Sequence, residues 1–145
     1  MTFQFWVKYL QVTSLFFAAM GVFWAIAGTF DPLGIWDAQL ARTFFNQDQL
    51  PLEVAQTKAF ILGPFGATAA GYFILQFSIA KYAYAQRQLW AYQAIVVGFS
   101  VWFILDSIMS AAHGAYFNIL LANIPSLLLM LPIFFTRPYF KEPPK

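Results

Sequence analysis

Four long apolar stretches, separated by shorter polar segments, dominate the chain. Asp31-Pro32 ends the first stretch and Arg137-Pro138 ends the fourth, because a proline restrains the residue before it from continuing a helix. A helix needs about 20 mostly apolar residues to cross a bilayer, and four stretches meet this requirement, at residues 9–30, 59–80, 91–112 and 117–136. The pattern predicts an all-α integral membrane protein of one domain, residues 1–145, folded as an up-down bundle of four transmembrane helices.

The connection between the first two spans, residues 31–58, is long for so small a bundle and has a helical pattern of its own. Trp36, Leu40 and Phe44 recur at intervals of four, and polar residues occupy other positions around the helix. Such a pattern is typical of an amphipathic helix that lies in the membrane interface. We therefore predict an amphipathic helical segment in this first, outer loop, where it forms either a simple cap over the bundle or a lid over a site that opens outward.

Composition supports the membrane assignment. The chain is 61% hydrophobic and only 10% charged, whereas soluble domains carry about 25% charged residues. A deficit of this size indicates that much of the surface faces apolar surroundings. The chain has no cysteine, which excludes disulfides, thiolate metal sites and thiol catalysis.

The distribution of basic residues predicts the orientation of the bundle. With the N-terminus inside, six Lys and Arg residues lie on the cytoplasmic side and two lie outside, as the positive-inside rule requires. We therefore predict a multi-pass protein of the cell membrane with both termini cytoplasmic. The six inner residues are Lys8, Lys81, Arg87, Arg137, Lys141 and Lys145, and the two outer ones are Arg42 and Lys58.

A motif near the end of the first span supports a different interpretation of the N-terminal segment. Ala25-Ile26-Ala27, followed by Gly28, resembles a signal-peptidase site after a hydrophobic region. The segment before the apolar run has a single lysine, and the run is long enough to span a membrane, which favours an intact first helix. Cleavage after residues 1–27 stays open as an alternative, and it leaves the orientation of the other helices unchanged.

Small residues recur at helical spacing on the first two spans. Membrane helices associate through close approach of their backbones, so a stripe of small residues marks a face that packs. We predict that the two stripes pack the first two helices together, with a homodimer interface as the alternative. The stripes are Ala18, Gly21, Ala25 and Gly28 on the first helix and Gly63, Ala67 and Gly71 on the second.

The third span carries Asp106 and the chain's only histidine, His113, in an otherwise apolar stretch. Asp106, Ser110 and His113 share one helical face. Asn118 and Asn123 return to a similar depth on the fourth helix. A charged carboxylate at the centre of a membrane costs about 2.5–3.5 kcal/mol, so we predict that Asp106 faces the interior and is linked to His113 through Ser110 or a water. The sequence leaves the charge state of the pair open.

These residues indicate a polar pocket in the outer half of the bundle. Such a pocket suits the polar head of an amphiphile, such as a lipid or a quinone. The alternative is that the same side chains form hydrogen bonds between helices, each worth about 0.6 kcal/mol. The candidate ligand-binding residues are Asp106, Ser110, His113, Asn118, Asn123, Lys58 and Trp102.

Metal binding and catalysis fit the pattern poorly. Asp106 and His113 are about 10.5 Å apart along a helix, which is too far to chelate one ion. Ser110 lies between them, whereas a catalytic triad places the histidine between the serine and the acid. We therefore predict no catalytic residue, no metal ligand and no cofactor, and a membrane enzyme is the less favoured class.

The predicted function is that of a small non-enzymatic membrane protein that binds an amphiphile or assists a membrane partner complex. The alternative is a small transporter or permease-like unit, built as an oligomer because the polar positions of one chain stop in its outer half. The predicted partners are the lipid bilayer, an amphiphilic small molecule, and a membrane protein or a second copy of the chain, with no nucleic acid. The layout is similar to that of the small four-helix bacterial membrane proteins that include the DoxX-like group, a resemblance of architecture that implies no functional residue.

Overall fold

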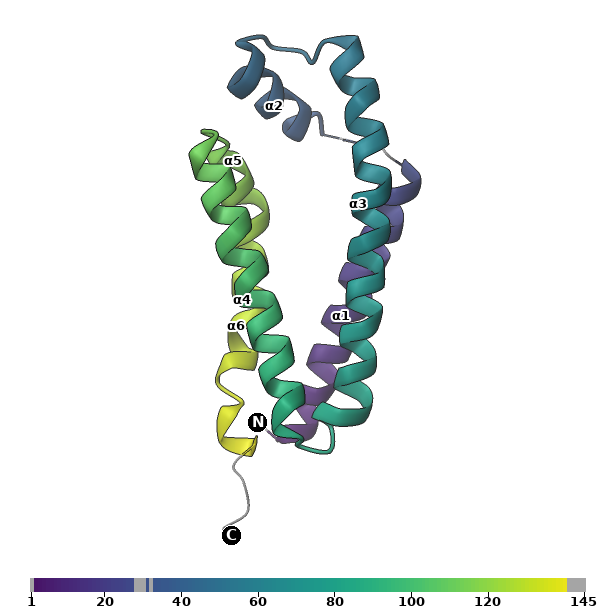
Figure 1. Cartoon of the computed structure of the whole chain (residues 1–145), viewed down its shortest axis with the longest axis vertical. Coiled ribbons are helices and arrows are strands. Elements are labelled where there is room, and N and C mark those ends of the chain that lie inside the picture. The colour runs from purple at the N-terminus through teal and green to yellow at the C-terminus, as the bar shows by residue number, and fades with distance from the viewer. Residues whose placement is uncertain (1, 28–30, 32, 141–145) are drawn as a thin grey trace. The chain divides into compact units, whose positions relative to one another are not determined.

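The computed structural model describes residues 2–27, 31 and 33–140. Every regular element in this part of the chain is helical, so the all-α class is confirmed (Figure 1). The long elements are α1 (Phe3–Ala27), α3 (Leu52–Ile79), α4 (Leu89–Ala112) and a composite fourth segment made of α5 (Tyr116–Asn118), the π-helix η2 (Ile119–Asn123) and α6 (Ile124–Phe134). The short elements are α2 (Ile35–Phe45), the π-helix η1 (Ala80–Tyr84) that continues α3, and the 3₁₀-helix η3 (Arg137–Phe140).

Four helical segments of the described chain are long and apolar enough to cross a membrane. They confirm the number and order of the predicted spans, although α1 begins at residue 3 instead of 9. The helix α3 begins at Leu52, seven residues before the apolar span at 59, where Pro51 in the sequence predicts a helix start. The first turns of α3 contain polar residues such as Glu53 and Lys58, so the helix begins before its apolar stretch. Residues 28–30, which the first predicted span included, lie outside the described residues. The four segments are Phe3–Ala27, Leu52–Tyr84, Leu89–Ala112 and Tyr116–Phe134.

Large apolar side chains are exposed on these segments. Ile26, Phe60 and Phe135 are 82%, 75% and 72% exposed. Soluble monomers rarely expose extensive apolar surface, because its contact with water is unfavourable. The four long helices and their apolar surface fit a multi-pass membrane protein.

Two of the α-helices, α3 and α6, contain prolines. Pro64 lies inside α3 and Pro132 inside α6, while Pro125 stands in the first turn of α6, directly after η2. A proline has no backbone N–H to donate to the preceding turn. Just before Pro125 the chain forms a wider turn, in which the N–H of Ile124 donates to the carbonyl of Ile119.

The chain divides into two compact units, and each is described by itself. The α2 unit consists of residues Phe17–Tyr72 and contains α2 with parts of α1 and α3. The α4–α6 unit consists of Met1–Phe16 and Phe73–Lys145 and contains the remaining parts of α1 and α3 together with the elements from η1 onward.

In the α2 unit, α1 and α3 approach so closely that glycine is required. A Cβ added to Gly66 would lie 2.5 Å from the backbone nitrogen of Ala25 and 2.5 Å from the carbonyl oxygen of Gly21, and one added to Gly21 would lie 2.6 Å from the backbone nitrogen of Ala70. The prediction that small residues pack the two helices together is confirmed. On α1 the predicted residues Gly21 and Ala25 make the contact, while Gly28 lies outside the described part.

On α3 the prediction was wrong for two of the three residues of the stripe. The predicted stripe contained Ala67 and Gly71, but both residues are exposed, and a Cβ on Gly71 would meet no atom within 4 Å. Gly66 and Ala70 make the close contact, and the predicted residue Gly63 also faces α1, where an added Cβ would lie 4.0 Å from the carbonyl oxygen of Ala25. Small residues occupy several faces of this helix, and their spacing alone does not select one face.

The α4–α6 unit has an aromatic and aliphatic core at its η3 end. The rings of Phe3, Tyr84 and Phe140 pack against one another, with centroids 4.8 Å apart for the closest pair, Tyr84 and Phe140. The turn between η1 and α4 places Arg87 in the left-handed region, with φ 58°, and its guanidinium carbon lies 5.0 Å from the centroid of the Phe3 ring. This cluster anchors η3 beside the beginning of α1.

Buried polar side chains in this unit are paired across helices. The Tyr84 hydroxyl donates to Thr136 Oγ1 at 2.8 Å, and Gln76 Nε2 donates to Ser14 Oγ at 3.1 Å. These hydrogen bonds give each buried polar side chain a partner, and a buried polar group without a partner would lower the stability of the fold.

Candidate functional site

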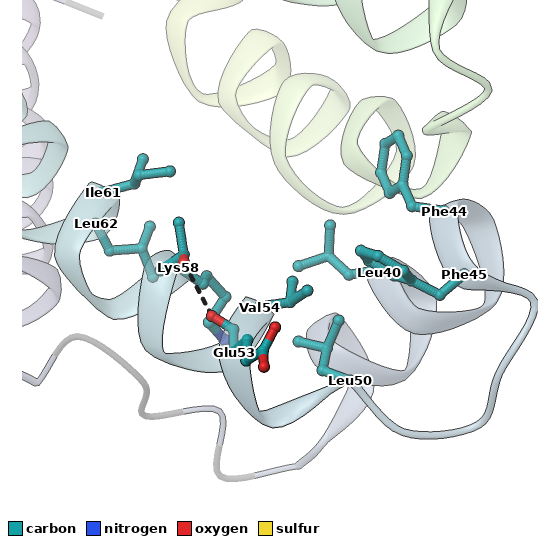
Figure 2. Close-up of a pocket in the computed structure, with 10 residues that line it drawn as sticks. Leu40, Phe44, Phe45, Leu50, Glu53, Val54, Lys58, Ile61 and Leu62 are labelled. Carbon is teal, nitrogen blue, oxygen red and sulfur yellow. Dashed lines mark hydrogen bonds between the residues drawn. The ribbon is translucent and has the colours of Figure 1, made fainter.

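An apolar cleft lies between α2 and the beginning of α3, entirely within the α2 unit (Figure 2). Its volume is about 570 Å³, which is in the range of small-molecule sites. Its polar lining residues are Glu53, Thr57 and Lys58, and its apolar ones are Leu40, Phe44, Phe45, Leu50, Val54, Ile61 and Leu62.

Backbone conformation at both ends of α2 positions this helix beside α3. Gly34 precedes it with φ 63°, and the side chain of Asp31 accepts a hydrogen bond from the backbone N–H of Asp37 at 2.9 Å. At the other end, Asn46 has φ 51° and donates its backbone N–H to the carbonyl of Ala41. Both residue types tolerate the left-handed region better than most, and Ala41 is completely buried.

An ion pair joins α2 to α3 in this unit. The ammonium group of Lys58 contacts the carboxylate of Asp37. The Lys58 side chain is 14% exposed and the Asp37 side chain 32%. Because both groups are partly buried, salt screens their attraction less than it screens an exposed pair.

Sequence reasoning included Lys58 among the candidates but missed Asp37 as its partner. The signal was present, because Asp37, Leu40 and Phe44 are three and four residues apart and therefore lie on one face of a helix. Leu40 and Phe44 line the cleft. Trp36, the third member of the predicted apolar stripe, is half-buried.

Among the residues that the structure describes, Lys58 is the only cationic side chain that lines the cleft. The hydroxyl of Thr57 donates to the carbonyl of Glu53 at 2.9 Å, so it is bonded to its own helix. Glu53 is exposed. The cleft therefore offers a largely apolar wall with one ammonium group, whose partner comes from the opposite helix.

A second polar site lies on α4, in the α4–α6 unit. The side-chain amide of Asn118 donates to Asp106 Oδ2 and to Ser110 Oγ, each at 2.7 Å. Ser110 is buried, and Asp106 and Asn118 are half-buried. The structure thus brings three of the predicted site residues together and joins α4 to α5 through them.

Asn123 forms a neighbouring contact. It is completely buried, and its Nδ2 donates to Ser107 Oγ at 2.8 Å. Its Oδ1 is buried without a hydrogen-bond partner among the residues that the structure describes. Ser107, which sequence reasoning did not single out, lies one position after Asp106 and so points about 100° away around the helix.

His113 does not occupy the predicted position. It is exposed, and its Nδ1 lies 2.9 Å from the carbonyl oxygen of Met109 on its own helix. In the described chain no hydrogen bond joins His113 to Asp106 or Ser110. The physical reason is that α4 ends at Ala112, so the helical face that contains Asp106 and Ser110 does not extend to residue 113.

Trp102 is 39% exposed, and its ring packs on Phe99 with centroids 5.7 Å apart.

Within residues 2–27, 31 and 33–140, no group of three or more His, Cys, Asp or Glu side chains is placed to hold a metal ion. The network on α4 thus offers hydrogen bonds between helices, and the cleft offers apolar contact beside one ion pair.

No family model matches the chain, and neither a curated protein nor a solved structure matches it.

Proposed function

We propose that this chain is a multi-pass protein of the cell membrane whose four long helices alternate in direction. The pairing of helices within each unit supports this topology. Gly21 of α1 packs against Ala70 of α3, and the later residue Ala25 packs against the earlier residue Gly66, so these helices run antiparallel in the α2 unit. In the α4–α6 unit, Asn118 contacts Asp106 near the end of α4, while the later residue Phe134 accepts a hydrogen bond at its carbonyl from the hydroxyl of Tyr92, near the beginning of α4. An alternating bundle leaves both termini on one side.

The distribution of charge supports a cytoplasmic location for both termini, with α2 on the outer side. Four basic residues fall near the cytoplasmic ends of the helices in this orientation, and all four are exposed. Lys141 and Lys145, which the sequence also assigned to that side, lie outside the described residues. The four residues are Lys8, Lys81, Arg87 and Arg137.

The length of the second span supports a cleft at the level of the lipid head groups. The segment Leu52–Tyr84 has 33 residues, which at a rise of 1.5 Å extend over roughly 50 Å, whereas the hydrocarbon core is about 30 Å thick. Exposed Lys81, with its ammonium 5.1 Å from the Tyr82 ring, suits the cytoplasmic interface. Counting about 20 residues back from Lys81 puts the outer hydrocarbon boundary near Ile61. Lys58 then lies at the head-group level.

The proposed activity is the binding of an amphiphile, such as a lipid or a quinone, in the cleft between α2 and α3. The observation that carries the proposal is an apolar cleft of about 570 Å³ whose wall contains Lys58, the more buried member of an ion pair between α2 and α3. An amphiphile has an apolar part that suits Leu40, Phe44 and Leu62 and a polar part that suits the charged residues. No chemical step is proposed, and the protein acts by holding its ligand.

The test is to fill the cleft and measure which lipids remain bound. The full chain is extracted in polymer nanodiscs with its native lipids, and the retained amphiphiles are identified by mass spectrometry. Val54→Trp and Leu62→Trp place large rings in the cleft, while Leu75→Trp is the control on α3, at a residue that is 59% exposed and does not line the cleft. We expect the wild type and the control to retain the same amphiphile and the two cleft variants to lose it. Equal retention by all four proteins would contradict the proposal.

A further inference from the structure

The ammonium group of Lys58 can bind more than its present partner. An ammonium has three N–H donors, and one of them is used by Asp37. Lys58 is the only cation that the described part of the chain contributes to the lining of the cleft, and its side chain is 14% exposed. A charge that is mostly removed from water needs a negative partner, so the apolar cleft contains a site at which an anion is favoured over a neutral group.

Asp37 is a partner that can be exchanged. Its side chain is 32% exposed, about twice as much as that of Lys58. When the pair separates, water can solvate the Asp37 carboxylate, while the Lys58 ammonium stays beside apolar side chains. The free-energy cost of separating the pair therefore arises mainly from the poorly solvated Lys58 ammonium. An incoming anion offsets this cost because it gives the ammonium a new negative partner.

The cleft has the capacity for one acyl chain. Its volume of about 570 Å³ lies within the range of small-molecule sites, and its lining is mostly aliphatic and aromatic, which suits an acyl chain. Glu53 also lines the cleft, but it is exposed, so water and salt weaken its repulsion of an anionic head.

We infer that Lys58 binds the anionic head of a single-chain amphiphile, either a carboxylate or a phosphate monoester, and that this head displaces Asp37. The inference rests on the proposed function, because it names the class of amphiphile that the same cleft holds. It assigns opposite roles to two residues of one ion pair. Lys58 attracts the ligand, and Asp37 competes with it.

The experiment compares two probes that differ in the head alone. Binding of hexadecyl phosphate and of hexadecanol to the full chain is measured by native mass spectrometry in nanodiscs of neutral lipid. The wild type is compared with Lys58→Gln, which removes the charge, and with Asp37→Asn, which removes the competitor. Inorganic phosphate is added as a head group without a chain.

The wild type should prefer hexadecyl phosphate by about tenfold or more, since a hydrogen bond to a charged group has this effect. Lys58→Gln should abolish the preference, and Asp37→Asn should increase binding of the phosphate probe, both without changing hexadecanol binding. Hexadecanol therefore reports that each variant still folds.

Three results would overturn the inference and leave amphiphile binding intact. They are a wild type without preference, a preference that survives Lys58→Gln, and weaker binding of the phosphate probe to Asp37→Asn. Displacement of the probe by equimolar inorganic phosphate would instead assign the site to a free anion. If neither probe binds the wild type, the proposed function itself fails.

Discussion

Replacing Gly66 with alanine perturbs the closest helix contact in the α2 unit. The added Cβ would lie 2.5 Å from two backbone atoms, the nitrogen of Ala25 and the carbonyl oxygen of Gly21. Ordinary contact begins near 3.5 Å, so α1 and α3 must separate by about 1 Å. Backbone atoms cannot turn aside as the end of a flexible side chain can. Overpacking of this kind costs about 1–3 kcal/mol, and the better helix propensity of alanine returns up to about 1 kcal/mol.

We therefore expect Gly66→Ala to lower the free energy of unfolding by about 1–2 kcal/mol. Gly71→Ala is the matched control, because it makes the same change on the same helix at a place where a Cβ meets no atom within 4 Å. It should be neutral or slightly stabilising. The measurement is reversible unfolding of the full chain by denaturing detergent added to neutral micelles. Equal stability of the two variants would refute the close packing of α1 on α3.

Three further predictions concern the α4–α6 unit and the topology. Asn118→Leu should lower the free energy of unfolding by about 1–3 kcal/mol, because it leaves the Asp106 carboxylate without its amide donor. Asp106→Asn keeps an acceptor and should change the free energy of unfolding by less than about 1 kcal/mol. Equal losses in the two variants would contradict this account of the network. Tyr84→Phe should lower the free energy of unfolding by about 1 kcal/mol, because it removes the buried hydrogen bond to Thr136. Tyr82→Phe, at an exposed ring, should have no measurable effect. Similar losses in the two variants would argue against the hydrogen bond to Thr136. Reporter domains inserted at positions 47 and 86 should fall on opposite sides of the membrane, outside and inside, and the alternating topology is wrong if both fall on the same side.

The helices could be predicted from the sequence because their main signal is local. About 20 apolar residues in a row are enough to identify a span, and the structure has helices at all four predicted places. Their ends were less predictable, because a helix does not end where hydrophobicity ends. Glu53, Thr57 and Lys58 are polar, yet they continue α3 beyond the apolar stretch.

Contacts between helices were harder to predict than the helices themselves. The depth of Asn118 relative to Asp106 followed from counting residues around a short turn, and the structure joins these two side chains. Contacts that depend on how a helix is rotated, such as Gly66 on Gly21, require knowledge of the partner's surface. His113 shows a different limit, because one residue beyond the end of α4 the helical spacing no longer predicts direction.

The most direct test of amphiphile binding in the cleft is a map of where a bound amphiphile reacts. The full chain in nanodiscs of neutral lipid is irradiated with a hexadecyl probe that carries a diazirine, and labelled residues are identified by peptide mass spectrometry. We predict labelling at Leu40, Val54 and Leu62 that saturates and is displaced by unlabelled probe. Labelling that is equally dense at Leu105 and Leu128, which are exposed elsewhere on the chain, and that unlabelled probe does not reduce, would contradict a binding site in this cleft.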